Sequence, residues 1–171
     1  MGWKNLSPGT GIFTMFDSRK LPIQSTCQVA VIGLGYVGLP LAINIGTPRK
    51  SFLNREFLNR KVIGYDINSK RIQELKENLD NTKEVSSNEI IKAKNLEFTD
   101  QIQQIIESDV FIVSVPTPID KAKRPNLDAL SLASTKIGEC LINRKRSTIP
   151  VIVFESTVYP GATEEFCIPI I

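Results

Sequence analysis

The stretch Val29-Ala30-Val31-Ile32-Gly33-Leu34-Gly35-Tyr36-Val37-Gly38 decides the fold, because a short apolar strand runs directly into glycines spaced G-x-G-x-x-G. Gly33 permits the tight turn out of the strand, and Gly35 removes a Cβ that would collide with a pyrophosphate. Gly38 lets the next helix pack closely against the sheet. The N-terminus of that helix favours an anion, since its free N–H groups and its dipole face the phosphates. The stretch therefore predicts a dinucleotide-binding turn.

A carboxylate follows the next strand, Lys61-Val62-Ile63-Gly64-Tyr65, at Asp66. A carboxylate in this place accepts both ribose hydroxyls of adenosine and repels a 2′-phosphate, so it predicts NAD rather than NADP. The alternative interpretation makes Asp66 an ordinary N-terminal residue of the next helix.

Predicted strands and helices alternate after residue 27, which favours an α/β fold: a Rossmann-type doubly wound parallel sheet with helices on both faces. Apolar periodicity predicts strands at 28–32, 62–65, 96–98, 110–115 and 151–154, and helices at 37–45, 69–79, 86–93 and 127–142. We expect the strand at 110–115 to be buried on both faces. Asp100 is expected to cap a helical turn, and Ser86 with Glu89 to form a capping box. We interpret 27–171 as one NAD-binding domain and 1–26 as an N-terminal extension, with Met15 as an alternative start.

The connection between Gly38 and Asp66 is longer than usual, 28 positions where the fingerprint has about 20. The surplus holds a near-duplication, 52–55 followed by 57–60. We expect Pro48 to end the first helix and about 47–60 to be an insertion at the sheet edge opposite the cofactor. It is either a tolerated loop or a partner-docking helix that exposes Phe52 and Phe57.

Composition excludes several classes of protein. The net charge of +3 is small and scattered, so we expect no nucleic-acid face. We interpret the cations Lys121, Lys123, Arg124 and the run Arg144-Lys145-Arg146 as solvated. No apolar run reaches the ~18 residues of a membrane span, and no membrane partner is expected.

The chain contains no histidine, which removes Ser-His-Asp hydrolysis and His-ligated zinc within these residues. Its three cysteines, Cys27, Cys140 and Cys167, are too few and too far apart for a metal site or a disulfide framework. We therefore expect no metal and a reducing, cytoplasmic location.

Two loops leave the ends of predicted strands, where ligands bind in such sheets. In the first, prolines on both sides of Thr117 fix the backbone and hold its hydroxyl in place. The second, Phe154-Glu155-Ser156-Thr157-Val158-Tyr159-Pro160-Gly161, brings a carboxylate and two hydroxyls to the same edge. Ser156 is either part of the site or a cap of the following helix.

Four phrases in order, VAVIGLGYVGLPLA, VIGYDIN..RI..L, VFIVSVPTPID and VIVFESTVYPGATEE, resemble the NAD-binding domain of the UDP-glucose/GDP-mannose dehydrogenase family. They are most similar to its UDP-N-acetylhexosamine 6-dehydrogenases. The resemblance implies that the pyrophosphate is held by Gly33, Gly35, Tyr36, Val37 and Gly38, and the adenosine end by Asp66 and Arg71. It implies that the nicotinamide side is lined by Val115, Pro116 and Thr117. It also implies that the residues near the reacting centre are Glu155, Ser156 and Thr157. Thr157 is implied to support proton transfer during catalysis.

The family oxidises the C6 alcohol of a UDP-sugar to an acid with two NAD, through a cysteine-bound intermediate. The resemblance places the nucleophilic Cys and its Lys, Asn and Glu partners beyond this chain. It thus implies an NAD-binding part truncated before the last strand of its sheet, without the sugar-binding and dimerisation domains, inactive alone and homo-oligomeric when whole.

Which UDP-sugar is the substrate stays open at this point. UDP-glucose 6-dehydrogenase, a dehydrogenase of small hydroxy acids and a catalytically inactive NAD-binding or assembly module are the alternatives. The hydroxy-acid enzymes share the glycine turn but give no reason for the paired VPTP and ESTVYPG loops.

Overall fold

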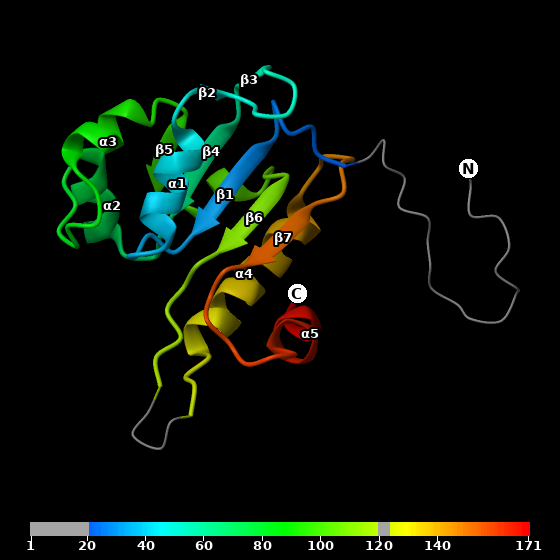
Figure 1. Cartoon of the computed structure of the whole chain (residues 1–171). Helices are drawn as coiled ribbons and strands as arrows, with labels where there is room; N and C mark the ends of the chain where they lie inside the picture. Colours follow the sequence, from blue (N-terminus) through cyan, green and yellow to red (C-terminus); the bar gives the residue numbers. More distant parts are fainter. Residues whose placement is uncertain (1–20, 120–123) are drawn as a thin grey trace, which may run out of the picture.

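The computed structural model describes residues 21–119 and 124–171. Its centre is a five-stranded parallel sheet in the order β5-β4-β1-β6-β7 (Figure 1). The strands are β1 Gln28–Ile32, β4 Lys61–Tyr65, β5 Leu96–Thr99, β6 Val110–Val113 and β7 Val151–Phe154. The strand order reverses on either side of β1, so the predicted doubly wound sheet is confirmed. Predictions for 1–20 and for Lys121 and Lys123 lie outside the described residues.

Helices cover both faces of this sheet, as predicted. One core packs the sheet against α1 Gly38–Gly46, α2 Ser69–Lys76 and α3 Ser87–Lys92. The other packs it against the 3-10 helix η2 Ile102–Ile105, α4 Asp128–Asn143 and the C-terminal η3 Thr163–Cys167, which continues into α5 Ile168–Ile170. In Figure 1, α4 passes behind β6 and β7, and α5 lies beside α4. Thr47 is the C-cap of α1, so the helix ends just before Pro48, as expected.

Of three local predictions about helix ends, one is confirmed and two are wrong. The capping box of Ser86 and Glu89 is confirmed. The helix expected to reach Leu79 ends at Lys76, because Asn78 takes φ +61° and leaves Leu79 half exposed. Asp100 does not cap η2: the N-cap of η2 is Gln101, whose N–H donates to the Thr99 hydroxyl at 2.9 Å.

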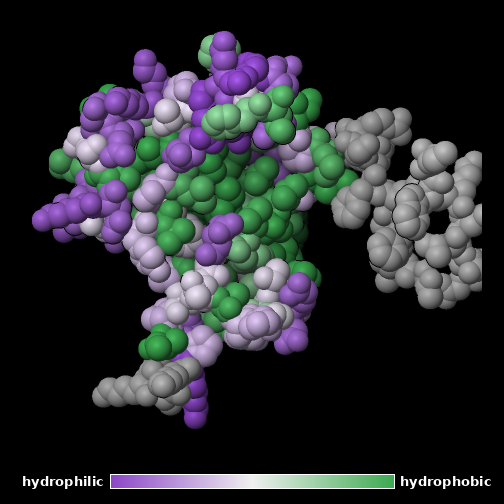
Figure 2. Space-filling view, viewed as in Figure 1, coloured by the Kyte–Doolittle hydropathy of each residue, from purple (hydrophilic) through white to green (hydrophobic). Residues whose placement is uncertain are grey.

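The front face of the sheet is open over β6 and β7. Figure 2 shows a continuous apolar surface there, between the polar helices at the left and the rim of the molecule. Val110 and Ile112 are half-buried, and Val151 is 37% exposed. The expectation that this strand is buried on both faces is wrong, because no described helix covers this part of the front face, and β6 ends at Val113 rather than at 115.

The segment predicted as an insertion forms a small antiparallel hairpin, with β2 Arg49–Lys50 paired to β3 Phe57–Leu58. It lies at the end of the sheet where β1 and β4 begin (Figure 1). The alternative of a docking helix is wrong, but Phe52 and Phe57 are exposed, as that alternative required.

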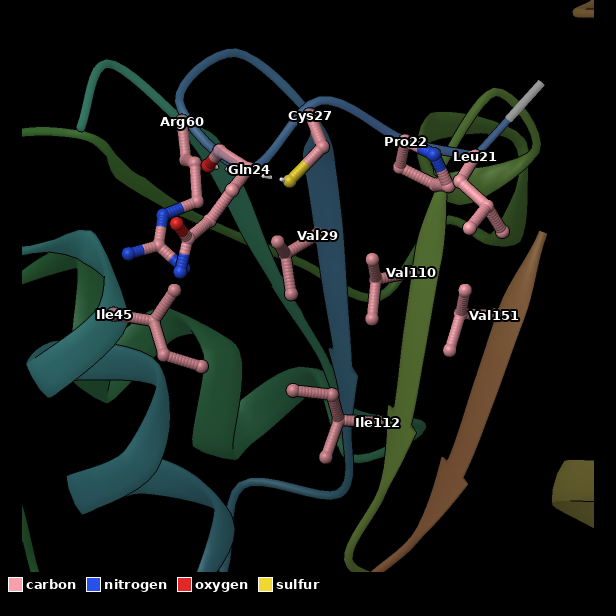
Figure 3. A pocket seen from close by; sticks show the side chains of 10 residues that line it. All are labelled: Leu21, Pro22, Gln24, Cys27, Val29, Ile45, Arg60, Val110, Ile112 and Val151. Atoms are coloured by element: carbon pink, nitrogen blue, oxygen red, sulfur yellow. Dashed lines mark hydrogen bonds between the residues drawn. The ribbon is translucent and has the colours of Figure 1, made fainter. Parts of the chain in front are cut away.

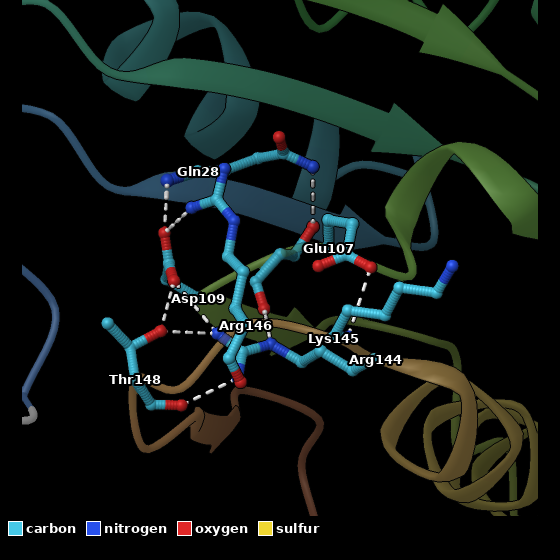
Figure 4. A network of polar contacts seen from close by, with 8 residues as sticks. Gln28, Glu107, Asp109, Arg144, Lys145, Arg146 and Thr148 are labelled. Atoms are coloured by element: carbon cyan, nitrogen blue, oxygen red, sulfur yellow. Dashed lines mark hydrogen bonds and ion pairs between the residues drawn. The ribbon is translucent and has the colours of Figure 1, made fainter.

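Figure 4 shows a buried ionic network at the same edge of the sheet. Asp109, at the start of β6, forms ion pairs with Arg144 and Arg146 and accepts hydrogen bonds from the Gln28 N–H and the Thr148 hydroxyl. The Arg144 side chain is only 4% exposed. Interpreting the whole run from 144 to 146 as solvated is therefore wrong, because Asp109 supplies a buried counter-charge that sequence does not reveal.

Candidate functional site

The glycine turn after β1 has the geometry that its spacing predicts. Gly33 takes φ +89°, a conformation that favours glycine. A Cβ on Gly38 would lie 1.9 Å from the carbonyl oxygen of Gly33 and 2.3 Å from the Ser114 hydroxyl. That hydroxyl donates to the Gly33 carbonyl at 2.9 Å. Gly38 is thus the close-packing glycine, and Ser114 ties the turn to the end of β6.

Gly35 differs, because a Cβ added there would meet no atom of the described protein within 4 Å. The space beside it is open, and Tyr36 and Val37 in the same turn are 69% and 39% exposed. α1 begins here, with the Leu39 N–H bonded to the Gly35 carbonyl at 3.0 Å. An open glycine surface at a helix N-terminus fits a pyrophosphate, which would occupy the space that a side chain would fill.

Asp66 connects this turn to the start of α2. Its Oδ2 accepts from the Leu34 N–H at 2.8 Å, and its Oδ1 accepts from the Asn68 N–H at 2.9 Å. The N-cap of α2 is Asn68, whose side chain accepts from the Arg71 N–H. Asp66 is therefore not the helix cap, and its half-buried carboxylate lies at the mouth of the crevice.

Arg71 is buried beneath the glycine turn. Its Nε and Nη2 both donate to the carbonyl oxygen of Leu34 at 3.1 Å, and its Nη1 pairs with Asp80 at 2.7 Å. Burial raises the pKa of Asp80, but hydrogen bonds from Thr82, Arg71 and the Val85 N–H outweigh it and lower that pKa to about 2. Sequence reasoning missed Asp80, although Asp80-Asn81-Thr82 carries the signal of an Asx turn.

The crevice itself is a cavity of about 380 Å³ between the ends of β1 and β4 and helix α4. Of the predicted site residues, Gly33, Gly35, Asp66, Arg71, Val115 and Pro116 line it. It is also lined by residues that the sequence did not single out: Tyr65, Ile67, Thr82, Ala129, Leu132 and Lys136. Tyr36, Val37, Gly38, Thr117 and 155–157 lie outside its lining.

The two predicted loops are bound to each other. The Thr117 hydroxyl donates to the Thr157 carbonyl at 2.6 Å, and the Ser156 hydroxyl donates to the Val115 carbonyl at 2.7 Å. Helix capping by Ser156 is thus wrong, since its hydroxyl is used by the neighbouring loop and the next helical turn starts at Thr163. Glu155 continues the β6–β7 pairing through its N–H, with its side chain exposed.

None of the three cysteines lines the crevice. Cys27 lies at the other end of the sheet, in a front-face cavity of about 320 Å³ (Figure 3). Burial raises the pKa of the Cys27 thiol, and it raises that of Cys140, inside α4, to about 11. Burial also raises the pKa of Cys167. Each thiol stays protonated at neutral pH, and no group of three metal-ligating side chains is found in 21–119 and 124–171.

A doubly wound sheet with an open glycine turn at its switch point, and a carboxylate after the adjacent strand, defines a dinucleotide-binding domain. A model of the NAD binding domain of the UDP-glucose/GDP-mannose dehydrogenase family matches residues 27–171. The chain belongs to this family, and its cofactor is NAD. None of the described helices has both the length and the apolar character to cross a membrane.

Two curated relatives are UDP-N-acetyl-D-glucosamine 6-dehydrogenases. The protein of Pseudomonas aeruginosa is 47% identical over 144 residues, and that of Salmonella typhi is 44% identical over the same length. Each match covers 84% of this chain and 30% of the relative. The solved UDP-D-ManNAc dehydrogenase of Pyrococcus horikoshii aligns with a TM-score of 0.66 and 29% identity, over 84% of this chain and 31% of its own. The chain therefore spans about 30% of the length of these relatives.

Proposed function

We propose that this chain is the cofactor-binding part of a UDP-N-acetylhexosamine 6-dehydrogenase. The whole enzyme would oxidise the C6 alcohol to a uronic acid with two NAD, in the cytoplasm, for surface polysaccharide synthesis. In this proposal 27–171 is the domain, 1–26 precedes it and 47–60 is its insertion. The 47% identity to a UDP-N-acetyl-D-glucosamine 6-dehydrogenase is the observation that carries the choice of substrate.

The geometry supports the roles that the family resemblance implies for the site residues. Gly33, Gly35, Tyr36, Val37 and Gly38 form the turn that would hold the pyrophosphate, and Asp66 would accept the ribose hydroxyls. Val115, Pro116 and Thr117 would lie on the nicotinamide side, with 155–157 near the reacting carbon. Bound NAD supplies a hydride acceptor. The bonds from Thr117 and Ser156 hold these two loops together, which would fix the position of Thr157.

A second candidate, an NAD-binding module that is inactive alone, is favoured by the cysteines. A four-electron oxidation of an alcohol needs a thiolate that holds the aldehyde until water attacks. Cys27, Cys140 and Cys167 are buried, have raised pKa values and lie outside the crevice. We therefore expect NAD binding without sugar oxidation by this chain.

The test joins this chain to the part of the Pseudomonas aeruginosa relative that its match leaves out. The chain alone and the chimera are each given NAD and one of four UDP-sugars: N-acetylglucosamine, N-acetylgalactosamine, N-acetylmannosamine or glucose. NADH absorbance should rise only with the chimera, and fastest with UDP-N-acetylglucosamine. A uronic acid made by the chain alone contradicts the expected inactivity. A folded, dimeric chimera that binds NAD but oxidises none of the four sugars contradicts the proposed substrate class.

A further inference from the structure

The hairpin of β2 and β3 carries apolar side chains that face solvent. Phe52 is 87% exposed, Leu53 is 88% exposed and Phe57 is 68% exposed. Single exposed apolar residues are common on protein surfaces, but three on one short hairpin form a patch. The cofactor crevice does not use this hairpin, which lies at the opposite edge of the sheet (Figure 1).

The base of the hairpin is anchored, so its tip is held outward. Leu58 is buried, and the following Asn59 N–H bonds to the Ser25 carbonyl at 2.8 Å. Ser51, which is 5% exposed, donates its N–H to the Glu56 carbonyl at 2.8 Å. The near-duplicate sequences therefore have different environments: Leu58 packs inward, whereas its counterpart Leu53 projects at the tip.

Positive charge is concentrated in the segment that forms the hairpin and leads into β4. The segment 49–61 contains five cations, Arg49, Lys50, Arg55, Arg60 and Lys61, and one acid, Glu56. Its net charge of +4 exceeds the +3 of the whole chain, so the charge is not scattered as the sequence was interpreted to mean.

Three of these cations, Arg49, Lys50 and Arg55, lie on the hairpin without an acidic partner among the described contacts, whereas Arg60 lines the front-face cavity. Lys50 lies 5.0 Å from the centre of the Phe57 ring, and Lys61 pairs with Glu97. Arg49 donates to the Asn44 side chain, a neutral partner. Lys50 and Arg55 are exposed on either side of Phe52 and Leu53. In Figure 2 the region of β2 and β3 accordingly mixes hydrophilic and apolar surface.

We propose that this hairpin is a peripheral contact with anionic lipid, in which Phe52 and Leu53 enter the headgroup region while the cations meet lipid phosphates. Apolar side chains surrounded by cations bind such interfaces through burial and electrostatic attraction together. Phe52, Leu53 and Phe57 project into solvent and line none of the five main cavities of the described residues. At protein–protein interfaces, by contrast, the residues that carry most of the binding energy cluster in well-packed pockets, so this tip fits a lipid surface better. The sequence analysis found no spanning segment and expected no membrane partner. A peripheral contact needs no spanning segment, so the proposal departs from that expectation.

The test mixes the whole chain with sedimenting vesicles of phosphatidylcholine, with and without phosphatidylglycerol. We expect binding at least about tenfold stronger to the anionic vesicles, weakening as salt is raised. The double variant F52S/L53S should lose at least about tenfold in vesicle binding while keeping the charge. The variant K50S/R55S should lose the preference for anionic vesicles.

A matched control is Ile142→Ser, which removes another large apolar side chain, 85% exposed, from α4. It should leave vesicle binding unchanged. All variants should keep their NAD affinity, because the glycine turn lies at the other edge of the sheet, so this test is independent of the proposed enzyme. Equal vesicle binding by F52S/L53S and the unaltered chain overturns the proposal, as does no binding to either vesicle. A dimer that F52S/L53S converts to a monomer would identify a second copy as the occupant and overturn it as well.

Discussion

The guanidinium of Arg71 holds the carbonyl oxygen of Leu34 with two hydrogen bonds, from Nε and from Nη2, each 3.1 Å long. Leu34 lies between the first two glycines of the turn, so a side chain of α2 fixes the backbone of the glycine turn from inside the protein. Asp80 and Thr82 hold the same guanidinium, at 2.7 and 3.3 Å. The turn is thereby supported by a segment more than forty residues further along the chain.

Replacing Arg71 by Lys should weaken NAD binding by about 1–2 kcal/mol, roughly five- to thirtyfold, because an ammonium cannot donate from two fixed positions. Calorimetric titration with NAD measures this, and the exposed neighbour Lys70→Ala serves as the control. The affinity for adenosine alone should stay unchanged, since Arg71 acts on the turn. An equal loss for adenosine would contradict this and support the direct adenosine contact that the family resemblance implies.

Gly35→Ala and Gly38→Ala form a matched pair, because each adds one methyl group to the same turn. Gly35→Ala should lose at least about tenfold in NAD affinity at an unchanged melting temperature, since its Cβ meets only the pyrophosphate space. Gly38→Ala should destabilise the fold by about 3 kcal/mol, because its Cβ collides with the Gly33 backbone. Thermal unfolding and NAD titration separate the two effects. Unfolding of the Gly35 variant would show that this glycine serves the fold first.

Asp66 should set the preference for NAD over NADP. Asp66→Asn keeps the shape but removes the charge and one of the two acceptors of the Leu34 and Asn68 N–H groups, so NAD should weaken by about 1–3 kcal/mol and the discrimination against the 2′-phosphate should fall. Titrating the unaltered chain and Asp66→Asn with NAD and with NADP gives the four affinities. Equal binding of NAD and NADP by the unaltered chain would contradict the assignment of Asp66 to the ribose.

Local signals predicted most of this fold correctly. The strands, the glycine turn and the capping box of Ser86 and Glu89 each depend on residues a few positions apart. The position of Asp66 at the end of β4 was likewise predicted from the sequence, since the dinucleotide-binding motif has a carboxylate after its second strand.

Contacts between distant segments account for the errors. Arg144 is buried because Asp109, 35 positions away, pairs with it. Ser156 does not cap a helix, because its hydroxyl bonds to Val115, which lies 41 positions earlier in the chain. The apolar sequence also led to an overestimate of the burial of β6, because it shows that the side chains are apolar but not whether a helix packs over them. The hydrogen bonds of Arg71 to the Leu34 carbonyl were not predicted for the same reason, since the two residues are 37 positions apart.

The Asp109 network should make stability depend on acid pH. Burial raises the pKa of Asp109, but hydrogen bonds from the Gln28 N–H and the Thr148 hydroxyl, with the charges of Arg146 and Arg144, lower it below its ordinary value. A carboxylate with a lowered pKa in the folded state stabilises the protein above its unfolded pKa of about 4. That contribution is lost as pH falls through the folded pKa.

Asp109→Asn should therefore cost about 3–5 kcal/mol near neutral pH, because it leaves the buried Arg144 without a counter-charge. Below about pH 4 the difference from the unaltered chain should shrink, since protonation then removes the same charge from the original residue. Urea unfolding at a series of pH values measures both. Glu107→Gln is the control, since that carboxylate accepts the exposed N–H of Lys145 and should matter little (Figure 4). Undiminished stability of Asp109→Asn at neutral pH would show that its hydrogen bonds, which asparagine partly keeps, outweigh its charge.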